Sequence, residues 1–402
     1  MISITVYKYQ STDLLSGAVL CDDLPLNVQS FSMQLNGSGT LTAALDLNED
    51  FAVNIPYVNA LTPRRSVLWV IADNFPVWAG IVWDWPDMTR QDGTLQISAQ
   101  TLDSLWGFRL ITDTLEYPAV DLFTAFADLT RYGMTKNSSF IEQGVSPPAT
   151  RDPAYLALFA TQGRVARFTI PDAGLSGSEW TASYTYSDLT QVSSAWSDMC
   201  SSGNLEYAFT PGLDEDGELI VSLQLGFTAL GRPQAETGVV LTYPGNALDY
   251  GWTVTGSQSA NLVWATAPPN GQELQWESVF PAGADLTDLA SFPVLESTVS
   301  WQGSNVTSQA QINTFANGQV ALLTGGMTTP TVNVGGSGFP PVQQLRLGDG
   351  VLLSFTSDLH PPGQNKQPGV EQEVRITAVT VYPPGPQQSE YMQLTTSAVV
   401  AA

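Results

Sequence analysis

Two apolar segments near the start of the chain read Val67-Leu68-Trp69-Val70-Ile71 and Val77-Trp78-Ala79-Gly80-Ile81-Val82-Trp83-Asp84-Trp85-Pro86. The first is a continuous apolar run, which is consistent with a β-strand buried on both faces. The second leads to a polar turn at Gln91-Asp92-Gly93, and Thr94 to Ala99 then alternate apolar and polar residues. These patterns predict consecutive strands separated by turns.

The residues before these segments extend the same pattern. Residues 2–7, 30–35 and 39–47 alternate apolar and polar side chains with the period of a half-buried strand. We therefore expect residues 1–112 to form one β-barrel or sandwich.

Helical periodicity is confined to three stretches, each of which we expect to pack on a sheet. The first follows Pro118 and ends near Gly133 as its C-cap, and the second has Ser187 and Gly203 as its caps. The third covers residues 308–324. The apolar positions are Val120, Phe123, Phe126 and Leu129 in the first, Leu189, Val192, Trp196, Met199 and Cys200 in the second, and Ile312, Phe315, Ala316, Val320 and Leu323 in the third.

The middle and the end of the chain divide between these helices and further strands. Residues 113–240 predict a small α+β unit, with an exposed loop at 136–150 and a hairpin around Asp214-Glu215-Asp216-Gly217. Residues 241–402 return to strands, at 252–255, 262–266, 351–355, 374–382 and 391–395. The last three echo the pattern of residues 67–99, which is what two similar β-units separated by a helical insert would produce; coincidence is the alternative.

The composition limits the classes of partner. Only 13% of the 402 residues are charged, and 38 acidic against 14 basic residues give a net charge of -24. Such a surface repels nucleic acid and anionic membranes, because phosphate binding needs positive charge. The charge can serve solubility alone, or it can form a surface that DNA passes without adhering. It excludes a sequence-specific DNA-binding protein.

Cysteine usage and hydropathy exclude further classes. Cys21 and Cys200 are the two cysteines, so there is no disulfide framework, and no Cys/His cluster predicts zinc. We expect no metal and no cofactor. Residues 1–10 lack the apolar core of a signal peptide, and no run reaches the roughly 18 apolar residues of a membrane helix. We expect a protein made in a cytoplasm, without a membrane anchor.

The sequence shows little sign of a catalytic site. His360, the single histidine, lies in a Pro-rich segment, and the chain has no G-x-S-x-G motif, so we interpret it as a loop residue. Zinc peptidases of the HExxH type need two histidines and are excluded. Glu277 and Glu296, near Trp276 and Trp301, are a candidate glycosidase pair, but 38 acidic residues make chance pairs abundant.

Two loop motifs have structural interpretations. Asp214-Glu215-Asp216-Gly217-Glu218 lacks the spacing of a calcium loop and predicts a hairpin turn. Gly335-Gly336-Ser337-Gly338 is followed by Phe339-Pro340-Pro341 and opens no helix, so it is a linker and not a phosphate site.

The eleven tryptophans are the remaining feature. Trp83 and Trp85 share a strand face by their i, i+2 spacing, as a row of sugar-binding rings would. Because Trp is amphipathic and common at protein–protein contacts, an oligomer interface or a core is favoured over a carbohydrate site. The candidate interface residues are Trp78, Trp83, Trp85 and Trp264.

Several segments carry a family resemblance. Phe31-Ser32-Met33-Gln34-Leu35-Asn36-Gly37-Ser38-Gly39, followed by residues 64–70 and 77–82, resembles the opening of minor tail proteins in siphophages of actinobacteria. Residues 256–264 and 292–296 are similar to later segments of that family. The resemblance covers most of the chain, and its motifs are structural signatures without an active site.

The resemblance implies a baseplate or tail-tip hub, similar to the central hub of contractile tails. Such hubs are homotrimers, and each subunit holds two β-barrels similar to the tail-tube fold, so that three subunits present six barrels to a hexameric ring. The implied partners are the distal tail protein or tail-tube ring, the tape-measure protein and other minor tail proteins. DNA would pass through the channel without specific binding, and no catalytic residue is expected.

Two other classes stay open. A protein that binds a host glycan or receptor predicts exposed Trp rows and binding to cell-wall material. A cell-wall hydrolase predicts turnover of peptidoglycan that depends on one carboxylate.

Overall fold

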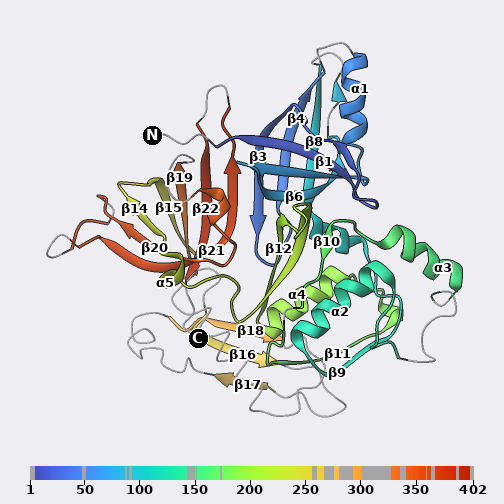
Figure 1. Cartoon of the computed structure of the whole chain (residues 1–402). Helices are drawn as coiled ribbons and strands as arrows, with labels where there is room; N and C mark the ends of the chain where they lie inside the picture. The colour runs from blue at the N-terminus through green and yellow to red at the C-terminus, as the bar shows by residue number, and fades with distance from the viewer. Residues whose placement is uncertain are drawn as a thin grey trace.

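The computed structural model describes residues 5–47, 51–86, 88–89, 93–142, 150, 152–172, 174–255, 260–266, 276–279, 293–300, 327–335, 341–358, 360–363, 367–385 and 389–398. The chain is mainly β, with one 14-stranded, almost wholly antiparallel sheet and a few helices (Figure 1). The predicted fold class, mainly β with α+β elements, is confirmed.

The first part of the large sheet, here the N-terminal half-sheet, has the strand order β3-β4-β8-β6-β5-β1-β2. The turn between β5 and β6 places Asp73 and Asn74 at positive φ, as a two-residue type I′ hairpin requires. The elements are β1 (Tyr7–Asp13), β2 (Val19–Cys21), β3 (Leu26–Gln34), β4 (Thr40–Asp46), α1 (Phe51–Ala60), β5 (Ser66–Ala72), β6 (Phe75–Asp84), β7 (Met88–Thr89) and β8 (Thr94–Thr101).

The C-terminal half-sheet has the order β15-β19-β22-β21-β20-β14. When β2 and β7 are left out, each half-sheet has six strands, which can be numbered one to six in chain order. Across the sheet, both half-sheets then have the same strand order, which is second, third, sixth, fifth, fourth, first. They differ in that β1 is antiparallel to β5, whereas β14 is parallel to β20. The strands are β14 (Val240–Tyr243), β15 (Ala247–Thr255), β19 (Met327–Gly335), β20 (Gly350–Phe355), β21 (Val370–Tyr382) and β22 (Tyr391–Ala398).

The long strand β21 joins the two half-sheets. Residues 370–375 pair with β20, while residues 378–381 pair with β3. Buried side chains of both half-sheets consequently form one hydrophobic cluster, which includes Phe31, Trp78, Phe355 and Leu394. The two half-sheets therefore share a core.

A middle unit packs on the other face of β5 and β6 (Figure 1). In β5, Leu68, Val70 and Ala72 enter the first cluster, while Val67, Trp69 and Ile71 enter the second. The predicted burial of this strand on both faces is confirmed. The unit contains η1 (Leu102–Phe108), β9 (Leu115–Asp121), α2 (Leu122–Thr135), α3 (Pro153–Leu158), η3 (Phe159–Gly163), β10 (Phe168–Thr169), β11 (Glu179–Tyr184), η4 (Tyr186–Asp188), α4 (Val192–Gly203), β12 (Leu205–Leu213) and β13 (Leu219–Phe227).

Both helices predicted for the middle unit exist, but their expected caps are wrong. Asp121 caps α2 by accepting from the amides of Phe123 and Thr124, and Lys136 takes the left-handed position at its end. Gly133 lies inside α2, where a Cβ would come within 2.7 Å of the Trp106 ring.

In the second helix, Ser187 lies in η4, and α4 begins only at Val192. Asn204 takes the left-handed position expected for Gly203. Asn is the residue after Gly that most readily adopts this conformation, whereas the N-cap of α4, Gln191, makes no side-chain capping hydrogen bond.

The remaining predictions divide between described and undescribed residues. The β12–β13 hairpin and all five predicted C-terminal strands are confirmed. One of these five, β16 (Leu262–Thr266), lies in a separate small sheet between β17 (Trp276–Val279) and β18 (Glu296–Ser300). The helix expected at 308–324 and the linker residues 336–338 lie outside the described residues. The boundaries at 112 and 240 stay predictions. Within the described ranges, no helix is long and apolar enough to cross a membrane.

Candidate functional site

The two half-sheets and the middle unit meet at one polar junction. The β3–β4 turn enters it through Asn36, which has a φ of 56°. The Asn36 amide donates to Tyr207 O at 3.1 Å, and the Tyr207 amide donates to Asn36 Oδ1 at 2.8 Å. Asn36 thus takes the place of a neighbouring strand beside β12. Nearby, Ser38 Oγ donates to Asp103 Oδ2 at 2.6 Å.

An ion pair joins the middle unit to the C-terminal half-sheet. Arg375 of β21 holds Glu206 of β12 in a two-pronged contact, with Nη1–Oε1 at 3.0 Å and Nη2–Oε2 at 2.5 Å. Both side chains are less than a fifth exposed. The Leu230 amide also donates to Glu206 Oε2 at 2.6 Å, and Arg375 Nη2 donates to Leu230 O at 2.9 Å. Charge-assisted pairs of this geometry fix orientation as well as distance.

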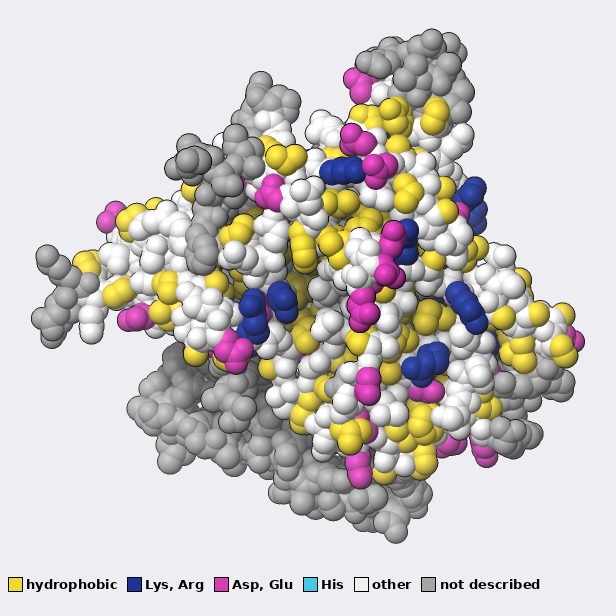
Figure 2. All heavy atoms as spheres, in the orientation of Figure 1, with side chains coloured by type: hydrophobic (Ala, Val, Ile, Leu, Met, Phe, Trp, Pro, Cys, Tyr) yellow, Lys and Arg dark blue, Asp and Glu magenta, His cyan; other side chains and the backbone are white. Residues whose placement is uncertain are grey.

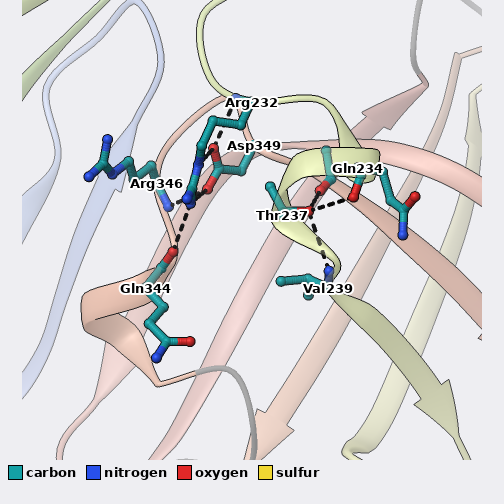
Figure 3. Close-up of polar contacts among 8 residues, drawn as sticks. Arg232, Gln234, Thr237, Val239, Gln344, Arg346 and Asp349 are labelled. Carbon is teal, nitrogen blue, oxygen red and sulfur yellow. Dashed lines mark hydrogen bonds and ion pairs between the residues drawn. The ribbon is translucent and has the colours of Figure 1, made fainter.

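A second ion pair lies where the chain enters the C-terminal half-sheet, just before the short helix α5 (Gln234–Thr237) (Figure 3). The Asp349 carboxylate is 1% exposed and accepts from Arg232 Nη2 at 2.6 Å and Nε at 3.2 Å. The amides of Arg232 and Arg346 donate to the same carboxylate at 3.0 and 3.2 Å. The hydrogen bond to Asp349 raises the pKa of Arg232, so this arginine stays charged.

Two glycines allow the backbones to meet between these pairs. Gly231 and Gly348 have φ values of +95° and +86°, which favour glycine. A Cβ on Gly348 would lie 2.0 Å from Leu230 O, and one on Gly231 would lie 2.2 Å from the carbonyl carbon of Gly348. The close approach therefore requires glycine on both sides.

One buried carboxyl group lies beside the junction. Asp103 is 5% exposed, and burial raises its pKa. Its Oδ2 accepts from Ser38, whereas Oδ1 has no hydrogen-bond partner among the residues that the structure describes. Within the described ranges, no group of three or more His, Cys, Asp or Glu residues is arranged to hold a metal ion. The junction consists of ion pairs, hydrogen bonds and close backbone contacts.

The four tryptophans predicted as interface residues differ in their burial and in their contacts. Trp78 is fully buried, with Nε1 donating to Ser32 O at 2.9 Å, so its side chain belongs to the core and cannot meet a partner. Trp264 is half-buried on β16 and donates to Glu296 Oε1 at 2.9 Å.

Trp83 and Trp85 do not share a face, contrary to the expectation from their spacing. Trp83 packs against the middle-unit cluster and Trp85 against the half-sheet cluster. The reason is that the β6–β8 register shifts between Val82 and Asp84, and β6 ends at Asp84. The Trp83 ring lies 4.7 Å from that of Phe108, which is 70% exposed and was missed from sequence. An interface role for Trp83, Trp85 and Trp264 stays a prediction.

The residues considered for catalysis are dispersed. His360 Nδ1 lies 2.9 Å from the Tyr250 hydroxyl, which is 2.5 Å from Ser357 Oγ, so the histidine packs against β15. Glu277 and Glu296 lie on strands on opposite sides of β16, paired with Ala265 and Leu262. The backbones of strands two apart in a sheet are separated by about 9.5 Å, so Glu277 and Glu296 are not neighbouring positions in this sheet.

The junction residues escaped sequence analysis. Glu206 and Arg375 are 169 positions apart, and Arg232 and Asp349 are 117 apart, with no motif around them. The one available signal was the segment 31–39, whose turn residue Asn36 makes the contact with β12.

Comparison with known proteins gives likeness in fold. No family model and no curated protein sequence matches the chain. A tail protein from Neisseria meningitidis MC58 superposes with a TM-score of 0.56 and 12% identity, covering 97% of this chain and 96% of that one. The 43 kDa tail protein of prophage MuSo2 from Shewanella oneidensis gives 0.55 and 10%, covering 98% of each chain. Prophage tail protein gp18 from Listeria monocytogenes EGD-e gives 0.53 and 11%, covering 96% and 94%. The chain has the fold of these tail proteins over nearly its whole length.

Proposed function

We propose that this chain is a non-enzymatic structural protein of a long-tailed bacteriophage, a siphovirus minor tail protein that forms a homotrimeric hub at the distal tip of the tail. The hub would join the hexameric tail tube or distal tail ring to the tip proteins, with the tape-measure protein and other minor tail proteins as further partners. It would be made in the host cytoplasm and reside in the virion.

The observation that carries the proposal is the common strand order of the two half-sheets. A subunit with two similar strand arrangements can present two similar surfaces, so three subunits present six. That is the geometry needed to match a threefold assembly to a sixfold ring. The full-length likeness in fold to three tail proteins supports the same assignment.

The net charge of -24 supports a role in DNA passage. If the trimer encloses the exit channel, acidic walls would keep the DNA polyanion from adhering during ejection. A basic or neutral inner wall, with the acids outside, would contradict this part of the proposal.

The test is to locate the protein in virions. Gold-labelled antibody against the chain, viewed by electron microscopy, should mark a ring at the end of the tail tube. Labelling of peripheral fibres would favour the receptor- or glycan-binding alternative, which also predicts retention on host cell-wall material. Peptidoglycan turnover that is lost in Glu277→Gln or Glu296→Gln would favour a hydrolase instead.

A further inference from the structure

The middle unit contains a cavity of about 360 Å³ between α2, residues 139–140 and residues 170–172. In Figure 2, the lower right part of the face shown, where Figure 1 places α2 and α4, mixes apolar, acidic and basic side chains. The cavity has the same mixed character, with an apolar part formed by Phe123, Phe140, Ile170 and Pro171 and a polar part described below. Small-molecule sites range from roughly 300 to 1,000 Å³, so this cavity has room for one small ligand.

Two walls of the cavity are fixed to each other by Asp121, the residue before α2. Its Oδ1 accepts from the amides of Phe123 and Thr124 at 3.0 and 3.3 Å. Its Oδ2 accepts from the amide and the hydroxyl of Ser176 at 2.9 and 2.8 Å. One carboxylate thus holds the chain that follows residues 170–172 against the first turn of the helix. The cavity is therefore formed before a ligand binds, which lowers the entropic cost of binding.

Asp128 is the buried hydrogen-bond acceptor of the cavity. It is 6% exposed, and its Oδ2 accepts from the Tyr117 hydroxyl at 2.9 Å and from Ser138 Oγ at 2.6 Å. Its Oδ1 makes no hydrogen bond with any residue that the structure describes. Burial raises the pKa of Asp128, and a carboxyl group with a shifted pKa in a cavity is a candidate binding group. A ligand that donates a hydrogen bond to Oδ1 would offset the cost of burying this oxygen.

The other polar side chains of the cavity balance the charge of Asp128. Arg131 lies one turn further along the same face of α2, where its charge partly offsets that of the carboxylate. Asp172 is exposed on the wall formed by residues 170–172. An anion in the cavity would therefore face two carboxylates, and a cation would face the guanidinium, whereas a neutral ligand is repelled by neither. Thr124 and Ser139 add exposed hydroxyl groups, which can donate or accept hydrogen bonds.

We propose that this cavity binds a neutral monosaccharide unit, either as a free sugar or as the end of a glycan. The hydroxyl groups of a sugar both donate and accept, so one can donate to Asp128 Oδ1 while another accepts from Arg131. The C–H faces of the sugar ring pack on the apolar part of the cavity, where Phe123 and Phe140 supply aromatic rings. A neutral ring that carries both kinds of surface thus matches the charge balance and the mixed lining together.

The sugar site goes beyond the proposed function and does not depend on it. The common strand order of the two half-sheets carries the hub proposal, whereas the cavity is built from the middle unit.

Saturation-transfer difference NMR on the full chain tests the site, with glucose, galactose, mannose, rhamnose and N-acetylglucosamine as probes. At least one of these sugars should give a saturable signal, and Asp128→Asn should raise its dissociation constant at least about tenfold. Ala127→Trp fills the cavity from the α2 side, keeps the carboxylate and should weaken binding as strongly. Asp216→Asn makes the same chemical change at an exposed position of the β12–β13 hairpin and should bind like the wild type. Circular dichroism and melting temperature check that each variant is folded.

L-Leucine tests a competing class of ligand, because a zwitterion could place its ammonium group on Asp128 and its carboxylate on Arg131. The proposal is overturned if none of the sugars gives a saturable signal, or if L-leucine binds and no sugar does. Unchanged sugar affinity in a folded Asp128→Asn or Ala127→Trp variant, or an equal loss in Asp216→Asn, also overturns it. If Asp128→Asn does not fold, Ala127→Trp decides. Tip labelling in virions would still support the proposed function in each case, so the two proposals can fail independently.

Discussion

Lys136 combines burial with positive charge. Its side chain is 2% exposed, Nζ donates to Leu110 O, and burial, reinforced by the nearby Arg109, lowers its pKa to about 8 from 10.5. A folded-state pKa below the unfolded one means that the folded chain loses this proton first as pH rises. Stability from this group is therefore full above pH 10.5 and is lost as pH falls toward 8.

We expect Lys136→Met to remove this pH dependence. The free energy of unfolding of the wild type, minus that of the variant, should rise by about 2 kcal/mol between about pH 7 and 9.5. Urea titrations across that range measure it. The scan stops below pH 10, because burial raises the pKa of Tyr132 and so gives the opposite slope above its ordinary value. A difference that is flat with pH would contradict the assignment.

We expect the loss of Arg375 to lower the free energy of unfolding more than the loss of an exposed cation does. Arg375→Met leaves the Glu206 carboxylate under a fifth exposed and without its cation, which we expect to cost about 3 kcal/mol. A double-mutant cycle with Glu206→Gln should give a coupling of at least about 1 kcal/mol. Lys8→Met breaks an exposed pair with Asp22 and should cost less than about 1 kcal/mol. Equal losses of unfolding free energy in Arg375→Met and Lys8→Met would contradict a stabilising role of Arg375 at the junction.

At the scale of elements, the turn before β20 is fixed by backbone approach. Gly348→Ala should destabilise the chain more strongly than Gly217→Ala. Both glycines have positive φ, +86° and +79°, but a Cβ on Gly348 meets Leu230 O, whereas one on Gly217 meets nothing within 4 Å. We expect about 1 kcal/mol at Gly217 from φ alone and several-fold more at Gly348. Thermal unfolding compares the two variants. Similar melting temperatures would show that the backbone at Gly348 can shift away from Leu230 to accept a Cβ atom.

Strand and helix existence could be predicted from sequence, while their ends could not. The alternation in β8 and the two-sided burial of β5 follow from side-chain period alone. Gly133 and Ser187 failed as caps because capping depends on which of several suitable residues the tertiary structure leaves free. Gly133 instead makes room for Trp106. The bulge that separates Trp83 from Trp85 has no local sequence signal.

At the scale of the whole molecule, the repeated strand pattern could be predicted from sequence, but the strand pairing that joins the two half-sheets could not. The echoing segments became β5, β6, β8 and β20, β21, β22, in equivalent positions of the two half-sheets. The pairing of β21 with β3 links positions such as Phe31 and Val381, which no local pattern connects. The Glu206–Arg375 pair has the same character, because it forms only when the middle unit and the C-terminal half-sheet are packed together.

The charge of the whole molecule sets the sign of the salt dependence of assembly. Screening weakens the repulsion between copies of net charge -24. Association should therefore strengthen on going from about 10 mM to about 150 mM NaCl, as the screening length falls from about 30 to about 8 Å. Analytical ultracentrifugation at several protein concentrations measures the association constant at each salt concentration. Dissociation on adding salt would mean that ion pairs between the copies outweigh the repulsion of their net charges.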